Sequence, residues 1–182
     1  ITYDNSTPDS PPANPGDTYT GSTFTVAADN VTTTKLNIPD TGTISDLNVT
    51  ISGSEACDLE YLDISLQSPY GTIVELVNLK TLSGKVFSST TFDDEASTKI
   101  GDGSAPYLGS YQPINSLSVF DKEEMKGDWI LVVYHQSGCG SEITAWSITI
   151  TYDNSTPDSP PANPELTYTG SAFTVAAGNV TT

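Results

Sequence analysis

The C-terminal part of the chain repeats its N-terminal part almost letter for letter. Residues 150–182 match residues 1–33, and only four of the 33 aligned positions differ. The repeat unit of about 149 residues has the size of a single domain and is much longer than the repeats of solenoid proteins. We therefore expect a slice of a tandem array, in which domains of this size follow one another along a longer parent protein.

A proline-rich segment, STPDSPPANP, occurs at residues 6–15 and again at 155–164. Proline fixes φ and has no N–H donor, so this composition predicts a semi-extended spacer. The preceding ITYDN at residues 1–5 copies the end of an alternating run. We expect it to be the last strand of a preceding domain, either disordered or paired with the edge of a neighbour.

These features divide the chain into four parts. Residues 1–17 are the end of the preceding repeat with its linker, and residues 18–153 are the domain. Residues 154–166 are the next linker, and residues 167–182 begin the next repeat.

Hydrophobic residues between the spacers alternate with a period of two, which indicates half-buried β-strands. The run at residues 73–77 is more continuous, as expected for a strand buried on both faces. Turn signals separate these runs, and only residues 121–126 (DKEEMK) look helical. The pattern predicts an antiparallel β-sandwich and fits jelly-roll and immunoglobulin topologies equally. The alternating residues are Leu47, Val49 and Ile51; Leu62, Ile64 and Leu66; Trp129, Leu131 and Val133; Trp146, Ile148 and Ile150.

The formal net charge is −17, with 23 acidic and six basic residues. Such a surface repels phosphate backbones and anionic lipids, which argues against nucleic-acid partners. No apolar run is long enough for a membrane span, so we expect no membrane insertion. The acidity fits either solubility or cation binding. The abundance of Thr, Ser, Asp and Asn is typical of secreted or cell-surface proteins.

Two cysteines, Cys57 and Cys139, lie in turn-like settings. In an exported chain, two cysteines most simply form one disulfide. A metal site is the alternative, and it would need further ligands, of which His135 is the only histidine.

Six short strings, in this order, resemble the P domain (Homo B domain) that follows the catalytic domain of proprotein convertases and of many bacterial subtilisin-like proteases. Together they cover nearly the whole repeat unit. The strings are IPD at 38–40; LDISL at 62–66 with SPYGT at 68–72; FDDEA at 92–96; GSYQP at 109–113 with Leu117 and Phe120; GDWIL at 127–131; and WSITI at 146–150.

The resemblance implies a jelly-roll β-sandwich that is not catalytic and that packs against and stabilises a protease domain. The chain departs from the family pattern at Tyr61 and His135, where the family commonly has Asp. Both positions lie near the cysteines, so a disulfide is expected to replace a polar or ion-bridged corner there.

Catalytic chemistry finds little support in the sequence. A hydrolytic triad needs a histidine beside a nucleophile, and the chain has one histidine and no Gly-x-Ser-x-Gly motif. We expect His135 to be structural and the module not to be an enzyme, although the parent could be a secreted serine protease.

Calcium is the candidate cofactor, because Asp93, Asp94 and Glu95 form a dense carboxylate cluster of the kind hard cations prefer. Neighbouring side chains on a strand point to opposite faces, so at most two of them could meet one ion. The alternative is a solvated charged loop. In the family interpretation Phe92 and Ala96 pack inward, which leaves Asp93 or Asp94 to brace a loop or hold an ion.

The aromatic residues divide into two groups. Trp129 and Trp146 lie in strands with aliphatic neighbours, which favours core packing over a sugar-stacking platform. Tyr70 and Tyr111 lie in predicted loops and are the candidates for exposed binding contacts.

Two functions follow as hypotheses. The first is a tandem, non-catalytic P-type module that stabilises or presents neighbouring domains of a secreted or cell-surface protein. The alternative is an adhesive or carbohydrate-binding module of a multi-copy adhesin, whose partners would be glycans or extracellular matrix proteins and whose linked copies would supply avidity.

Overall fold

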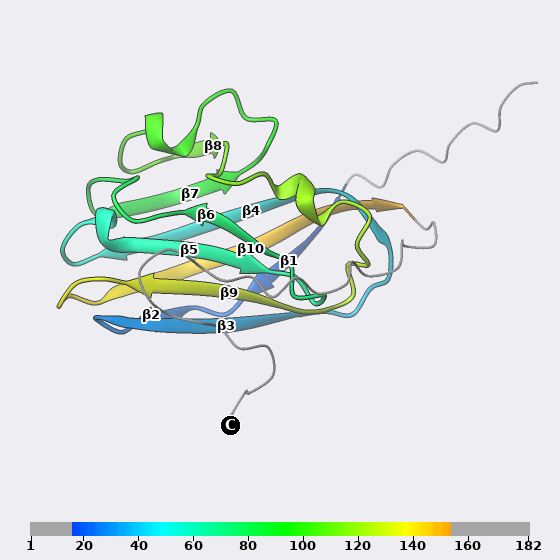
Figure 1. The fold of residues 1–182 in the computed structure, drawn as a ribbon, viewed down its shortest axis with the longest axis horizontal. Helices are drawn as coiled ribbons and strands as arrows, with labels where there is room; N and C mark the ends of the chain where they lie inside the picture. Colours follow the sequence, from blue (N-terminus) through cyan, green and yellow to red (C-terminus); the bar gives the residue numbers. More distant parts are fainter. Residues whose placement is uncertain (1–15, 154–182) are drawn as a thin grey trace, which may run out of the picture.

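Ten β-strands and three single-turn 3₁₀ helices make up the computed structural model, which describes residues 16–153 (Figure 1). The expected linkers and partial repeats at residues 1–15 and 154–182 lie outside the described residues. The 3₁₀ turns are η1 (Leu59–Tyr61), η2 (Ile100–Asp102) and η3 (Leu117–Phe120). The strands are β1 (Asp17–Gly21), β2 (Phe24–Val26), β3 (Asn30–Ile38), β4 (Thr43–Glu55), β5 (Leu62–Gln67), β6 (Ile73–Val77), β7 (Val86–Phe92), β8 (Gly109–Tyr111), β9 (Gly127–His135) and β10 (Ser141–Asp153).

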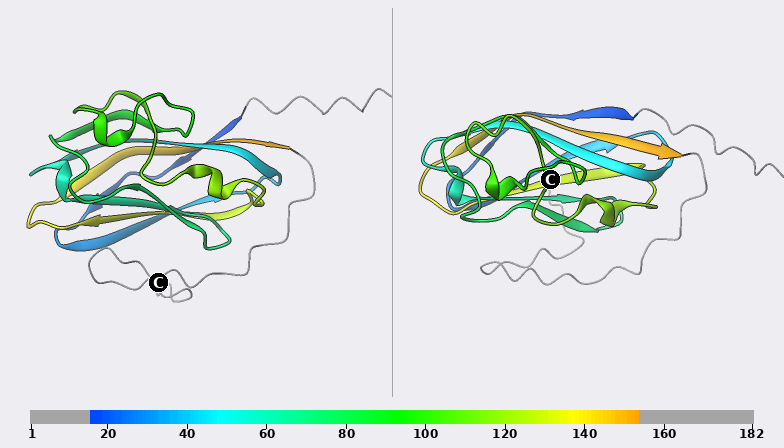
Figure 2. Two further views of the ribbon diagram at one scale, coloured as in Figure 1. Left: turned by 45° about the horizontal axis from the view of Figure 1, so that its top comes forward. Right: turned by 90° about the horizontal axis from the view of Figure 1, so that it is seen from above.

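The strands form two sheets that pack face to face as a sandwich and do not close into a barrel (Figures 1 and 2). One sheet has the order β1-β10-β4-β7-β8, with β2 also paired to β10, and the other has the order β3-β9-β5-β6. If β1 and β2 count as one broken strand, the chain crosses between the sheets in the sequence of a jelly roll, and β8 is an added parallel strand on β7. The predicted all-β jelly-roll sandwich is thus confirmed.

The core lies between the sheets and follows the predicted alternation. The inward apolar side chains of β4, β5, β9 and β10 are 0–2% exposed, and β-branched and aliphatic side chains suit this pleated, half-buried surface. Trp129 and Trp146 are fully buried, as expected, and their ring N–H groups donate to the carbonyls of Met125 and Ser22.

Two local predictions are wrong. The continuous apolar run at Ile73–Val77 is an edge strand, β6, in which Ile73 and Glu75 are partly exposed. The strand buried along nearly its whole length is β5.

The second error concerns residues 121–126, which form a turn and no helix. Their backbone bonds to the start of β4 instead: Lys122 N–H donates to Ile44 O, and Ile44 N–H donates to Glu123 O. Lys122 also has φ 68°, a left-handed conformation that a right-handed helix does not contain. Tertiary backbone pairing therefore overrides the local helix propensity of Glu, Met and Lys.

None of the helices within residues 16–153 is long and apolar enough to cross a membrane.

Candidate functional site

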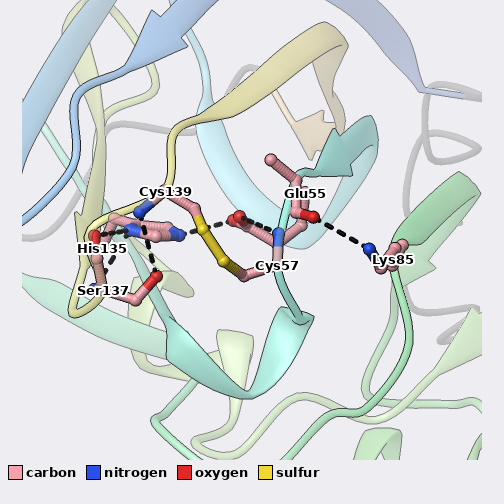
Figure 3. The surroundings of a disulfide bond; sticks show 7 residues. Glu55, Cys57, Lys85, His135, Ser137 and Cys139 are labelled. Carbon is pink, nitrogen blue, oxygen red and sulfur yellow. Dashed lines mark hydrogen bonds and ion pairs between the residues drawn. A yellow bond between two sulfur atoms is a disulfide. The ribbon is translucent and has the colours of Figure 1, made fainter.

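The Cys57–Cys139 disulfide joins the loop after β4 to the loop between β9 and β10 (Figure 3). The two Cα atoms are 5.9 Å apart, and the cysteines are separated by 82 positions in the sequence. The predicted pairing is confirmed. On the chain-entropy model a cross-link over this span constrains the unfolded chain by about 4 kcal/mol.

A buried acid–base pair lies beside the disulfide. His135 Nε2 is 2.6 Å from Glu55 Oε2, and both side chains are 0% exposed (Figure 3). The other carboxylate oxygen, Glu55 Oε1, accepts the N–H of Cys57 at 3.0 Å. The second ring nitrogen, His135 Nδ1, lies 3.1 Å from the carbonyl oxygen of Ser137. The pair therefore connects the end of β4, the cysteine loop and the β9–β10 turn.

The contacts at this corner are those of a structural site that holds three parts of the fold together. A histidine acting as a general base needs access to a substrate proton, and here both ring nitrogens contact protein groups in a fully buried site. The expected structural role of His135 agrees with this geometry. Lys85 adds a further contact, because its Nζ donates to the carbonyl of Ala56 at 2.9 Å.

Sequence reasoning missed Glu55 as the partner of His135. A signal was present, since Glu55 continues the inward positions of β4 that begin with Leu47, Val49 and Ile51. A carboxylate at the end of such a register must be paired if it is buried. The single histidine of the chain was the natural partner.

The predicted calcium residues form a tight turn directly after β7. Asp93 Oδ1 accepts the N–H of Glu95 at 2.8 Å. Asp94 turns toward the start of η3, where its two oxygens accept the N–H groups of Leu117 at 3.0 Å and Ser118 at 2.9 Å. Ser116 Oγ donates to the same carboxylate. Asp94 thus braces a neighbouring loop, while Phe92 and Ala96 are buried.

Further carboxylates lie near this turn. Partial burial raises the pKa of Asp46 above its ordinary value, with smaller contributions from the negative charges of Asp93 and Asp94 and an opposing hydrogen bond from the Leu47 backbone. A hydrogen bond with Asp93 is the main cause that raises the pKa of Glu95. Within residues 16–153, no group of three or more His, Cys, Asp or Glu side chains is arranged to hold a metal ion. Calcium binding stays a prediction.

Tyr70 and Tyr111 lie on different sheets. Tyr70 is in the turn between β5 and β6, as predicted. The prediction of a loop at Tyr111 is wrong, because this residue ends strand β8, which pairs with β7. Both are partly buried, and the Tyr111 ring stands edge-on to the buried Tyr107 with the ring centres 6.1 Å apart. The structure does not bring the two tyrosines together with the acidic turn into one site, and their binding role stays a prediction.

No protein-family model matches the chain, and no curated protein matches it in sequence. Among solved structures, the chain is similar to part of a crystal structure of the serine protease of Aeromonas sobria in complex with its chaperone. The TM-score is 0.50 at 14% identity, and the match covers 80% of this chain and 28% of that chain. The same protease without the chaperone gives a TM-score of 0.47 at 14% identity, with 79% and 28% covered.

A third similar structure is that of dimeric latent PorU from Porphyromonas gingivalis, with a TM-score of 0.35, 15% identity and coverage of 75% of this chain and 13% of that one. The chain thus spans little more than a quarter of the length of the Aeromonas protein. At this identity the similarity to the Aeromonas complex concerns the fold alone.

Proposed function

We propose that this chain carries a non-catalytic P-type β-sandwich module, which stabilises or presents an associated domain of a secreted or cell-surface protein. A subtilisin-like protease is the associated domain that the P-domain resemblance favours. The observation that carries the proposal is the arrangement of the motif strings that the chain shares with P domains. Strings far apart in the sequence lie against one another in the sandwich.

Two contacts illustrate this arrangement. Gly127, which opens the GDW string, has φ +132°, and a Cβ at this position would lie 2.8 Å from Pro69 of the SPYG turn. Glycine at that position therefore suits the close approach of the turn. On the other sheet, Phe92 of the FDDEA string is paired with Tyr111 of the GSYQP string, and Asp93 N–H donates to Tyr111 O at 3.0 Å.

The burial of reactive groups supports a role other than catalysis. The only histidine of the chain is bonded inside the core, and both cysteines form a disulfide. The disulfide also supports an oxidising, extracellular location, because such bonds persist outside the cytosol.

Exposed apolar residues support packing against a neighbour. The large exposed hydrophobic residues within the described part of the chain all come from the segment between the start of β7 and η3. Leu108 is 67% exposed and Val119 is 56% exposed, and the others are Val86 and Ile114. An accessory module would cover some of these side chains with the domain that it stabilises.

The test uses the parent protein, with whatever domain its reading frame encodes next to this module. Leu108→Asp or Val119→Asp should lower the melting temperature of the neighbouring domain by several degrees, whereas Ser110→Asp, at an exposed position of β8, should not. If deleting the whole module leaves both the stability and the activity of the neighbouring domain unchanged, the accessory role is wrong.

The alternative is a module of a multi-copy adhesin, and the observation that favours it is the near-identical second copy of residues 1–33. Linked copies raise effective concentration without new contacts. An adhesin should bind glycans or matrix proteins weakly as one unit and at least tenfold more tightly as several, measured by surface plasmon resonance with arrays of one to four units. An accessory module should show no saturable binding in this assay.

A further inference from the structure

The edge of β10 is occupied by a segment that the chain encodes twice. β1 and β2, which are residues 17–26, pair antiparallel with β10, from Asp17 opposite Ile150 to Val26 opposite Ser141. The residues that correspond to β1 and β2 in the second copy are 166–175. Both segments belong to the same chain, and twelve residues separate the second one from the end of β10.

Three groups of β1 and the following loop fit closely onto β10. Gly21 lies over the ring of Trp146, where an added Cβ would be 2.0 Å from the ring atom Cε2. Trp146 Nε1 donates to the carbonyl of Ser22 at 3.2 Å. The hydroxyl groups of Thr18 and Thr149 are 2.9 Å apart. The site on β10 therefore selects a strand with glycine at the position facing Trp146.

The second copy retains the residues that make these contacts. Thr167, Gly170 and Ser171 correspond to Thr18, Gly21 and Ser22, and the apolar positions of β2 are also kept as Phe173 and Val175.

Two of the four differences between the copies lie within the segment itself. Leu166 replaces Asp17, which loses the hydrogen bond that Tyr152 Oη donates to that carboxylate at 2.8 Å. Ala172 replaces Thr23, which is exposed. The other two differences, at positions 165 and 178, lie outside residues 166–175.

The connection from β10 to the second copy is long enough for it to fold back. Residues 154–165 supply twelve residues between the end of β10 at Asp153 and Leu166. Antiparallel neighbours can be joined by as few as two residues, and twelve extended residues reach about 40 Å. The connection is therefore long enough for a return onto the β10 edge in the β1 register once β1 and β2 have left that edge.

We propose that residues 166–175 are an alternative occupant of the β1–β2 site on β10 of the same chain. The first copy is the major occupant, because only three residues, 27–29, link it to β3 and keep it near the site. When a substitution prevents residues 17–26 from pairing with β10, residues 166–175 pair there instead, while β3 stays paired with β9. In an array, each β10 would then have two possible partner segments, one from its own unit and one from the next. This inference does not depend on the proposed function.

The test uses the full 182-residue chain and three variants: Gly21→Val, Gly170→Val and the double variant. Valine facing Trp146 excludes the segment that carries it. Each single variant should keep a melting temperature within a few degrees of that of the unsubstituted 182-residue chain. The double variant should melt at a much lower temperature and should show red-shifted tryptophan emission. Thr20→Val and Thr169→Val, at the exposed neighbouring position and its counterpart, are the matched controls. If Gly21→Val alone melts as low as the double variant, the proposal is wrong.

A cysteine trap reports the exchange directly. Thr149→Cys with Thr167→Cys, in the Gly21→Val background, should form a new disulfide within the monomer, identified by peptide mapping alongside the native Cys57–Cys139 bond. Thr149→Cys with Thr18→Cys in the otherwise unchanged chain is the positive control. Failure of the 149–167 bond to form, or its formation only between two molecules, would overturn exchange within one chain.

Discussion

The two ends of β4 carry carboxylates in opposite settings. At its C-terminal end Glu55 is buried, bonded to His135 and flanked by the disulfide. About 30 Å away along the strand, Asp46 is half-buried near Asp93 and Asp94, whose negative charges add to the rise of its pKa. At the first end the Glu55 carboxylate is paired with His135. At the second end, partial burial and nearby negative charges disfavour the ionised form of Asp46. The comparison shows that the fold closes one end of the sandwich with a disulfide and a buried pair and gathers carboxylates at the other.

Glu55→Ala should have the largest effect, because it leaves His135 buried without its carboxylate partner. Removing one member of a buried pair costs about 3–5 kcal/mol of unfolding free energy. Glu142→Ala, at an exposed position of β10, should cost less than about 0.5 kcal/mol. Urea unfolding of both variants checks the difference. Equal midpoints would mean that the buried pair contributes nothing to the closed end.

Replacing both cysteines by serine should have the next largest effect. The loss of a cross-link over this span is expected to cost about 2–5 kcal/mol. Thermal unfolding of the double variant measures the loss, and treating the parent protein with a reductant should reproduce it. If the cysteine-free variant is as stable as the unsubstituted chain, the His135–Glu55 pair alone is sufficient to stabilise the fold at the C-terminal end of β4.

Asp94→Ala tests the acidic end. The change removes the acceptor for the N–H groups of Leu117 and Ser118, a loss comparable to that of a helix cap, about 1–2 kcal/mol. Glu95→Ala, one residue away and exposed, is the control and should be nearly neutral. Hydrogen exchange should speed up at Leu117 and Ser118 in the first variant only. Unchanged exchange there would contradict a bracing role for Asp94.

The smallest effect is the pH dependence contributed by Asp46. Its raised pKa means that the folded state binds the proton more tightly than the unfolded state. The resulting stabilisation is fully present below the ordinary Asp pKa of about 3.9 and is lost as the pH rises through the raised value. Asp46→Asn should therefore raise the melting temperature slightly at pH 7 and leave it unchanged near pH 3.

Asp128 is the opposite case on the other sheet. Hydrogen bonds from Asn37 and Lys35 lower its pKa, so its stabilising contribution is present at neutral pH and is lost as the pH falls through the lowered value. Asp128→Asn should slightly lower the melting temperature at pH 7. If both variants shift it in the same direction, the assigned electrostatic causes are wrong.

The fold could be predicted from the sequence because strand alternation and turn residues are local signals. β4, β5, β9 and β10 follow directly from the spacing of their buried side chains. The errors at β6 and at residues 121–126 have non-local causes. The continuous apolar run does not reveal that β6 is an edge strand, and residues 122 and 123 pair with Ile44, which is distant in the sequence.

The candidate site was predictable only in part. Two cysteines allow one intramolecular pairing, so the disulfide followed from composition. The partner of His135 was harder to predict, because 23 acidic residues offer many choices and only the alternation of β4 marks Glu55 as an inward position. The loop braced by Asp94 lies more than twenty residues away from it, and no local pattern encodes that contact.

The pairing of β1 with β10 has a mechanical consequence. The chain enters the sandwich at Asp17 and leaves it at Asp153, and Asp17 lies opposite Ile150, so both attachment points are at the same end of one antiparallel pair (Figure 2). Tension on the linkers would separate β1 from β10 one hydrogen-bonded pair at a time. Strands separated in this way resist less force than strands pulled past one another, because the hydrogen bonds break singly. The disulfide would then stop the extension, because the residues between Cys57 and Cys139 cannot be pulled out while the cross-link holds. The extension of the domain would therefore be limited to the residues outside positions 57–139.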